Sequence, residues 1–600
     1  MKLKNILLVS SALLCFSSCD DLFEPAIENQ QDITQMFKDK EFARGILGSA
    51  YLQLPYSGST NSDVATDDAV SNDPANDYLK MAIGGWASNA DPMSQWQGRY
   101  NAIQYCNIMI ENAEKVEWAT DETLNKLYVD HFLGNAYAMR GLQFFYLLRA
   151  HAGVDASGEL MGAPIHTASE DGGSDFNQPR ASFKECIDQI LADLAEAEKY
   201  LPFTYGDVAQ NDPVLAKYNC TNGQYNRAFG SHEIGKIDGK IIAAVRAQVA
   251  LFAASPAYQA GNAMTWEEAA KYAGNLLEKI GGTKQMEQKG YTWYCNADEL
   301  DKLGDKDNTN EIIWRDNIGK PSNDDKDNWV ETKNFPPSLE GKGLVNPSQN
   351  LVDAFGMANG RPITDAKSGY DPAKPYEGRD PRLEAYIVYN GSKIGENEIH
   401  TAVNADNLDG IGTKPNYSTR TGYYMRKFTR DDVSVIAGKE VSQNHYNARI
   451  RATEIFLAYA EAANEAGGPN GKYGDAAFSA KDVIKALRER AGICVGTPDA
   501  YLNECAASKE QMRELIRNER RIELCFENQR FYDLRRWNVD TNKLNEGVKG
   551  IQITAEKADG TIEAKYIDVE NRAYKDYMIY GPLPYSEIMK WNNLSQNKGW

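Results

Sequence analysis

The sequence predicts a mostly α fold with long irregular, loop-rich inserts and minor β structure. Apolar residues recur at spacings of three and four near both ends of the chain, turn-forming residues crowd its middle, and two short segments have the character of strands. The 600 residues are enough to bury a large core, and 42% hydrophobic with 25% charged residues is typical of globular proteins.

Helical periodicity is clearest before residue 290 and after residue 448. Within 183–201, Ile187, Ile190 and Leu194 form one apolar stripe, and Pro202 ends the helix. The predicted helices cover residues 102–116, 124–150, 183–201, 237–254, 266–280, 449–466, 480–491 and 509–527. Paired helices of this size, joined by short breaks and rich in Ala and Tyr, are typical of tetratricopeptide-like units. Because no strict period repeats, an irregular helical domain is the alternative to this scaffold.

Composition divides the chain into four segments. They are a signal peptide at 1–18, an N-terminal helical region at 19–289, a loop-rich region at 290–447 and C-terminal helices at 448–600. In the loop-rich region Gly, Pro, Asn and Asp recur every few residues, and the strand candidates lie at 312–314 and 385–389. Because loops on a rigid frame often carry binding sites, we expect candidate ligand loops here.

The N-terminus has the residue order of a secretory signal. Lys2 and Lys4 precede an apolar stretch over 6–16, which is shorter than the ~20 residues that span a bilayer. Two serines and Cys19 follow, and small residues directly before a Cys resemble a lipobox, where the Cys is acylated. The sequence therefore predicts lipidation of Cys19 and anchoring by its acyl chains. A plain secretory signal with an incidental Cys is the alternative.

The charge balance limits the classes of partner. The formal net charge is −20, and loss of Lys2 and Lys4 with the signal peptide makes it −22. Phosphate backbones require a concentrated basic face, so we do not expect nucleic acid as a partner. Neutral or cationic ligands suit the chain better.

Catalytic and metal-binding motifs do not stand out. The chain has no G-x-S-x-G elbow, Walker loop or G-x-G-x-x-G, and its six histidines are widely spaced. Its 85 acidic residues form too many pairs for a glycosidase pair to be recognised. The neighbours of Cys106 and Cys525 are apolar and predict buried thiols rather than a disulfide framework. We therefore expect no catalytic site, no cofactor and no metal. A calcium ion at the acidic loop 305–309, which lacks the usual turn glycine, is the less favoured alternative.

Motifs along the chain resemble one known family. The strongest are IRNERRIEL at 516–524 and FENQRFYDLRRW at 526–537. Further matches lie at 346–355, 379–383, 421–428, 454–462, 581–584 and 593–597. Together they resemble the SusD/RagB family of nutrient-binding outer-membrane lipoproteins. The resemblance implies a SusD-like fold and a binding protein that is not an enzyme.

The signature motif itself is predicted to be scaffold. Leu515, Ile516 and Ile522 form an apolar stripe, while Arg520 and Glu523 lie at ion-pairing distance along the helix. We therefore assign the motif to packing and ion pairs rather than to ligand contact.

Ligand contacts are predicted at aromatic side chains in polar loops. A sugar ring has an apolar C–H face that stacks on Trp or Tyr, while Asp, Asn and Arg hold its hydroxyls. The predicted ligand-binding residues are Trp86, Trp293, Trp329, Tyr291, Asp67 and Asp68. For the indoles the alternative is packing within the loop, and for the aspartates it is bracing of the loop.

The resemblance also implies a partner and a place. Such proteins act as hinged lids over a TonB-dependent transporter of the SusC type, to which they pass an oligosaccharide. Asp20 and Asp21, directly after Cys19, resemble the acidic export tag of surface lipoproteins, which implies the outer face of the outer membrane. Two other functions stay open. One is a RagB-like importer lid that binds peptides, and the less favoured one is a glycoside hydrolase.

Overall fold

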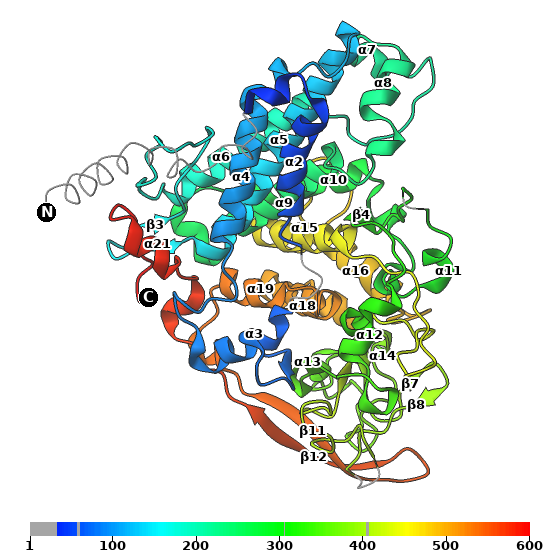
Figure 1. Ribbon diagram of the computed structural model, residues 1–600. Coiled ribbons are helices and arrows are strands. Elements are labelled where there is room, and N and C mark those ends of the chain that lie inside the picture. Colours follow the sequence, from blue (N-terminus) through cyan, green and yellow to red (C-terminus); the bar gives the residue numbers. More distant parts are fainter. Residues whose placement is uncertain (1–32, 57–60, 305, 404–406) are drawn as a thin grey trace, which may run out of the picture.

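The computed structural model describes residues 33–56, 61–304, 306–403 and 407–600 (Figure 1). The predicted signal peptide at 1–18 and the lipidation site Cys19 lie outside the described residues. Helices dominate the chain, so the predicted mostly α class is confirmed. No helix in these ranges combines the length and apolarity that a membrane span needs.

The scaffold is a row of helices that pack on one another in chain order (Figure 1). The row runs through α4 (Trp96–Asn112), α5 (Glu122–His151), α6 (Phe183–Tyr200), α9 (Gly239–Ala254), α10 (Trp266–Lys279) and α15 (Ala452–Gly467). At its start α2 (Lys40–Leu52) packs on α4, and at its end α16 (Ala480–Arg490) and α18 (Lys509–Glu523) pack on α15. This ordered stacking is the repeat-like arrangement that the periodicity predicted. Helix α2 was not predicted.

Local sequence signals set where the long helices begin. α6 starts with a capping box in which Ser182 and Glu185 bond each other's backbone N–H groups. α10 starts with the same device from Thr265 and Glu268. Asp121 caps α5 by accepting a hydrogen bond from the N–H of Leu124. These caps explain why the predicted and observed starts of the three helices agree within two residues.

Short helices fill the connections. They are α3 (Asp77–Lys80), α7 (Val214–Tyr218), α8 (Asn222–Phe229), α11 (Ala297–Leu300), α12 (Val330–Asn334), α13 (Gln349–Ala354), α14 (Pro381–Tyr386), α17 (Ala500–Cys505), α19 (Arg530–Arg536), α20 (Thr541–Leu544) and α21 (Tyr585–Lys590).

The strands of the described residues form two-stranded antiparallel sheets. The pairs are β1 (Ala69–Ser71) with β5 (Val345–Pro347), β2 (Gly153–Val154) with β3 (Leu160–Met161), β4 (Ile312–Arg315) with β10 (Ala448–Arg451), β6 (Ile387–Val388) with β9 (Tyr424–Met425), β7 (Lys393–Ile394) with β8 (Asn397–Glu398), and β11 (Val548–Glu556) with β12 (Ile562–Glu570). The predicted strand at 312–314 is confirmed. The strand predicted at 385–389 is wrong in its first half, because Asp380 caps a helix whose first residue is Pro381.

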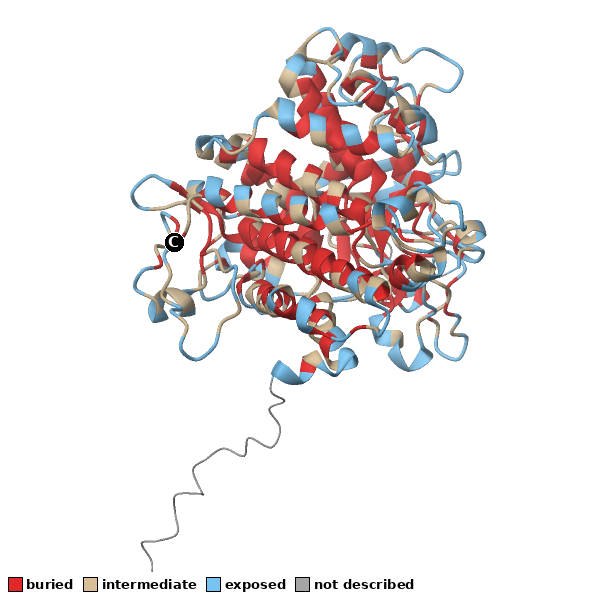
Figure 2. Cartoon of the chain, turned by 90° about the horizontal axis from the view of Figure 1, so that it is seen from above, coloured by how far each residue is buried: buried red, intermediate tan, exposed pale blue. Residues whose placement is uncertain are grey.

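The main hydrophobic core joins the two ends of the chain. One cluster draws residues from α2 to the C-terminal segment, and it includes α9, α10, α15 and α18. Two smaller clusters lie under the loop-rich region. Figure 2 shows the buried residues concentrated along the central helices, with exposed residues in the surrounding loops. Cys106 and Cys525 are buried free thiols, as predicted.

Helix α18 carries buried carboxylates that bind arginines from distant segments. Arg382 contacts Glu519 at 2.9 Å and Glu523 at 3.1 Å. Arg490 reaches Glu523 at 2.6 Å, and Arg451 reaches the same carboxylate at 3.4 Å. All five side chains are buried. The signature motif thus packs and forms ion pairs, as its predicted scaffold role requires. The predicted pairing of Arg520 with Glu523 along the helix is wrong, because Arg520 contacts Asp533 at 2.8 Å instead.

We expect Glu523→Ala to lower the free energy of unfolding by about 3–5 kcal/mol, because removal of one buried partner leaves uncompensated charge on the others. Urea denaturation would measure this loss. The matched control is Lys485→Ala, which breaks an ion pair with Glu489 whose two side chains are 58% and 60% exposed. The control should change stability by less than ~0.5 kcal/mol. Equal effects of the two substitutions would contradict a dominant role for the buried charges.

Candidate ligand cleft

The three indoles predicted to bind ligand lie in three separate hydrophobic clusters. Trp86 is 5% exposed in the main core, Trp293 is 3% exposed in the second cluster, and Trp329 is 3% exposed in the third. The Nε1–H of Trp86 donates to Asp91 at 2.8 Å, and that of Trp329 donates to the carbonyl of Ser322 at 3.0 Å. Such rings have no free face for a sugar. The prediction that they stack on a glycan is therefore wrong in this conformation, and the packing alternative applies.

The two predicted aspartates are buried in ion pairs. Asp67 contacts Arg530 at 2.9 Å, and Asp68 contacts Arg521 at 2.6 Å. Burial alone would raise the pKa of Asp67, but the two arginines hold that pKa well below its usual range. These pairs tie the early loop to the signature motif. The contacts therefore support the alternative, in which the two aspartates brace the loop rather than bind ligand. Tyr291 is half-buried against the second cluster, and its ligand contact stays a prediction.

A different set of aromatic residues lines an open cleft near the C-terminus. Its walls are the start of α4, the loop that follows β3, and the segment around α21, and its volume is about 510 Å³. We call it the C-terminal cleft and define it by the lining parts of 94–101, 164–176 and 584–594. Its volume falls in the range of small-molecule sites. Figure 1 shows α21, which forms one of its walls, near the C-terminus.

His151, the last residue of α5, holds two walls of this cleft together. Its Nε2 accepts a hydrogen bond from the N–H of Gln95, just before α4, at 3.0 Å. Its Nδ1 lies 2.6 Å from the carbonyl oxygen of Pro582, to which it donates. Burial lowers the pKa of His151 to about 4, so the ring is neutral at pH 7 and can both accept and donate. The start of α4 is thereby fixed against the C-terminal segment.

Arg180 fixes the third wall. Its guanidinium donates to the carbonyl oxygens of Gly162 at 2.7 Å and Met161 at 3.0 Å, and to Oδ1 of Asn597 at 2.9 Å. Burial lowers the pKa of Arg180 to about 10, which still leaves it charged at neutral pH. One buried cation therefore joins the loop after β3 to the last residues of the chain.

Aromatic faces and hydrogen-bonding groups share the cleft. The rings of Trp591 and Phe176 lie 6.1 Å apart with their planes 28° from parallel, and Phe176 is 41% exposed. Tyr100 is half-buried beside them, with its hydroxyl donating to the carbonyl of Pro164 at 2.9 Å. Polar side chains also line the cleft, among them Gln97, Asn101, Glu170, Ser586, Glu587 and Lys590. Flat apolar faces beside hydroxyl-binding groups are the chemistry that recognises a saccharide.

Sequence reasoning missed this cleft because its walls are far apart in the chain. Phe176 and Trp591 lie on segments that meet only in the folded protein, where Asn177 Nδ2 also donates to Asn592 Oδ1 at 2.8 Å. The one available signal was Trp591, a tryptophan in a polar C-terminal segment. No group of histidine, cysteine and carboxylate side chains suited to a metal occurs among the described residues.

Two family models match the chain. One is described as the SusD family and covers residues 310–600, and the other is described as starch-binding associating with outer membrane and covers residues 26–214. The chain belongs to the SusD/RagB family. A SusD-like protein of Formosa agariphila is 23% identical over 91% of this chain and 93% of its own length.

Solved structures of SusD-like proteins share the fold. One from Bacteroides fragilis superposes with a TM-score of 0.71 at 24% identity and covers 96% of this chain and all of its own. A SusD-like carbohydrate-binding protein of the same species has a TM-score of 0.66 at 19% identity, covering 93% and 99% of the two chains. A laminarin-binding SusD-like protein has a TM-score of 0.56 at 20% identity, covering 94% and 100%.

For this SusD/RagB protein we expect Trp293→Ala to destabilise the fold by about 3–5 kcal/mol, because it empties a buried indole site. Trp591→Ala removes a half-buried ring and should cost less than half as much. Thermal unfolding of both variants would measure the difference. An unchanged melting temperature for Trp293→Ala, together with lost glycan binding, would restore the original prediction for that indole.

Proposed function

We propose that this SusD/RagB protein captures glycans at the outer surface of the cell and passes them unchanged to a TonB-dependent transporter of the SusC type. The aromatic platform of Trp591 and Phe176, set among hydrogen-bonding side chains, is the observation that carries the capture step. The names of two solved relatives, one carbohydrate-binding and one laminarin-binding, support a glycan rather than a peptide.

The proposed binding mode follows from the groups that line the C-terminal cleft. A pyranose ring lies against Trp591 or Phe176, which gains ~1 kcal/mol per stack beyond the area buried. The carboxylate of Glu587 accepts hydrogen bonds from the sugar hydroxyls, and the amide of Asn101 can both donate and accept. Few contacts of this kind give weak binding, between ~1 mM and ~1 μM, which is 4 to 8 kcal/mol. Weak binding suits a protein that must release its ligand.

The remaining steps of the proposal rest on the anchor and the partner. Acylated Cys19 holds the protein on the outer membrane, and the acidic residues after it direct it to the exterior. The description of the matching N-terminal family model, starch-binding associating with outer membrane, supports this place. The protein, which covers the transporter as a hinged lid, then passes the glycan to it.

We expect Trp591→Ala and Phe176→Ala each to weaken retention of the protein in glycan-containing gels, by about five- to tenfold, because each removes one stacking face worth ~1 kcal/mol. Affinity electrophoresis across a panel of neutral polysaccharides would measure this. Tyr566→Ala serves as the matched control, since Tyr566 is 55% exposed on β12 and lines none of the three cleft walls.

Retention of both cleft variants at the level of the unmodified protein would contradict the cleft as the glycan site. Failure of the unmodified protein to bind any glycan, with binding of peptides in calorimetry, would replace the glycan by a peptide. New reducing ends after incubation with a polysaccharide would show catalysis and contradict the binding role.

We further expect Cys19→Ser to move the protein from the membrane fraction to the soluble fraction, because a serine cannot receive the thioether-linked lipid. Cell fractionation, with protease treatment of intact cells for the surface orientation, would measure both points. A control Cys15→Ser variant retains the acylation site and should stay with the membrane. Membrane retention of Cys19→Ser would exclude this residue as the anchor.

A further inference from the structure

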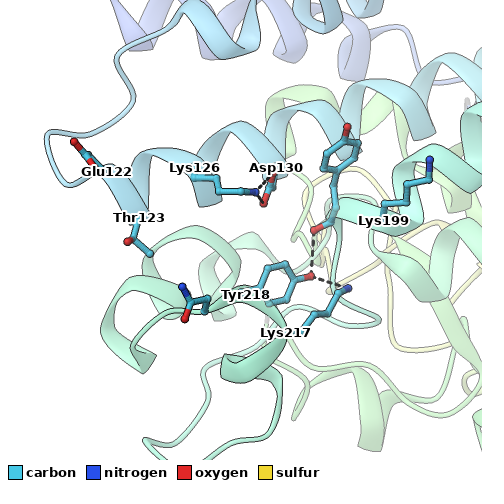
Figure 3. A pocket seen from close by; sticks show the side chains of 9 residues that line it. Glu122, Thr123, Lys126, Asp130, Lys199, Lys217 and Tyr218 are labelled. Atoms are coloured by element: carbon cyan, nitrogen blue, oxygen red, sulfur yellow. Dashed lines mark hydrogen bonds and ion pairs between the residues drawn. The ribbon is translucent and has the colours of Figure 1, made fainter.

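A second pocket lies at the other end of the helical scaffold. It is formed by the first turns of α5, the end of α6 and the short helix α7, and has a volume of about 490 Å³. Figure 3 shows Lys126 and Asp130 on α5 facing Lys217 and Tyr218 on α7. We call it the α7 pocket. It differs in character from the C-terminal cleft, because three lysines line it.

The three lysines differ in what neutralises them. Lys126 contacts Asp130 at 2.7 Å, and Lys199 contacts Glu196 at 2.5 Å. Lys217 has no carboxylate at ion-pair distance among the described residues, and its Nζ donates to the hydroxyl of Tyr218 at 3.2 Å. Lys217 is therefore the lining cation that an incoming anion would neutralise.

The surroundings of Lys217 disfavour its charge in the free protein. Burial lowers the pKa of Lys217; Asp130 on α5 opposes this shift, while Lys279 on α10 adds to it. Lys279 also has no carboxylate at ion-pair distance among the described residues and lies over the ring of Phe203 at 3.5 Å. An anion bound at Lys217 would relieve this repulsion.

Aromatic, amide and carboxylate groups complete the α7 pocket. Tyr200 and Tyr218 are half-buried, and the hydroxyl of Tyr218 donates to the carbonyl of Tyr200 at 3.1 Å, which fixes its ring. The buried carboxylate of Asp130 and the exposed side chain of Asn219 provide acceptors and donors for hydroxyls. A cation, a fixed aromatic ring and hydroxyl-binding groups in one pocket match a sugar that carries an acidic group.

The two sites are separate. The C-terminal cleft lies by the end of α5, where His151 bonds Gln95, whereas the α7 pocket is lined by Glu122 at the start of the same helix. α5 has 30 residues, so its ends lie ~45 Å apart. A single sugar unit in one site therefore does not contact the other.

We propose that the α7 pocket binds uronic-acid units of a glycan, with the carboxylate on Lys217, the ring against Tyr218 and hydroxyls on Asp130 and Asn219. This inference rests on the proposed function for the saccharide nature of the ligand. It adds acidic sugars to the ligands of the protein. The C-terminal cleft does not select for them, because its lining Lys590 is already paired with Glu587 at 2.9 Å.

The test uses the mature protein with ¹³C-methylated lysines, titrated in NMR with glucuronate and, separately, with glucose. Lys217→Arg identifies the Lys217 signal by its absence. Glucuronate should shift this signal saturably and glucose should not, and raised ionic strength should weaken the effect several-fold because the pair is partly exposed. Lys485, which is exposed and paired with Glu489, provides the control signal.

Calorimetry with a glucuronate-containing oligosaccharide completes the test. Lys217→Gln should lower its affinity about tenfold, while Lys217→Arg, which keeps the charge, should stay within about threefold. A Lys217 signal that glucuronate does not move, or an unchanged affinity in Lys217→Gln, would overturn the inference. Loss of that affinity in Trp591→Ala alone would assign acidic sugars to the C-terminal cleft. Retention of neutral glycans, which tests the proposed function, is measured independently of these outcomes.

Discussion

The fold depends on a network of buried charges around α18. Burial alone would raise the pKa of Glu523, but Arg490, Arg451 and Arg382 outweigh it and hold that pKa at about 2. Because the folded pKa lies below the unfolded one, this carboxylate stabilises the protein above pH ~4.5 and loses its contribution as pH falls towards 2. The three arginines come from segments outside α18, so one carboxylate fixes how the loop-rich region meets the helical scaffold. Such a network stabilises only when every member is paired.

The same principle positions the sites. Arg521 binds Asp68 and Arg530 binds Asp67. These ion pairs fix the early loop against the signature motif. At the C-terminal cleft a neutral His151 and a charged Arg180 donate to backbone carbonyls of the segments that form its walls. Each joint is buried, so its hydrogen bonds are protected from water and the walls keep their spacing. Exposed aromatic rings can then be offered to a ligand without a cost for ordering the loops beneath them.

Periodicity predicted the scaffold because the spacing of apolar residues alone identifies the buried face of a helix. The binding site could not be predicted in the same way. The sequence shows that a tryptophan has polar neighbours in the chain, but not whether other residues cover its ring in the folded protein. Trp86 illustrates this: Asp91, five residues on, accepts its N–H and lets the ring enter the core. Long loops form small hydrophobic clusters of their own, in which Trp293 and Trp329 are buried. The aromatic pair that stays open, Phe176 and Trp591, is created by tertiary contact. For the strand at 385–389 the contrary signal was present, in Asp380 followed by Pro381.

The C-terminal cleft and the α7 pocket are both open to solvent, and this bears on the proposed transfer of ligand. A protein that only stored a glycan would gain from enclosing it, because a buried ligand loses more water-exposed surface and dissociates more slowly. Here the platform ring Phe176 is 41% exposed, and Lys217 lies at a pocket rim formed by a five-residue helix. In the proposed binding modes each site holds its ligand by a few contacts, and the two sites lie towards opposite ends of a helix ~45 Å long. A long glycan that engaged both would be retained by avidity, while a short product would leave either one readily. Selectivity for length would thus arise from the distance between two weak sites rather than from the depth of one.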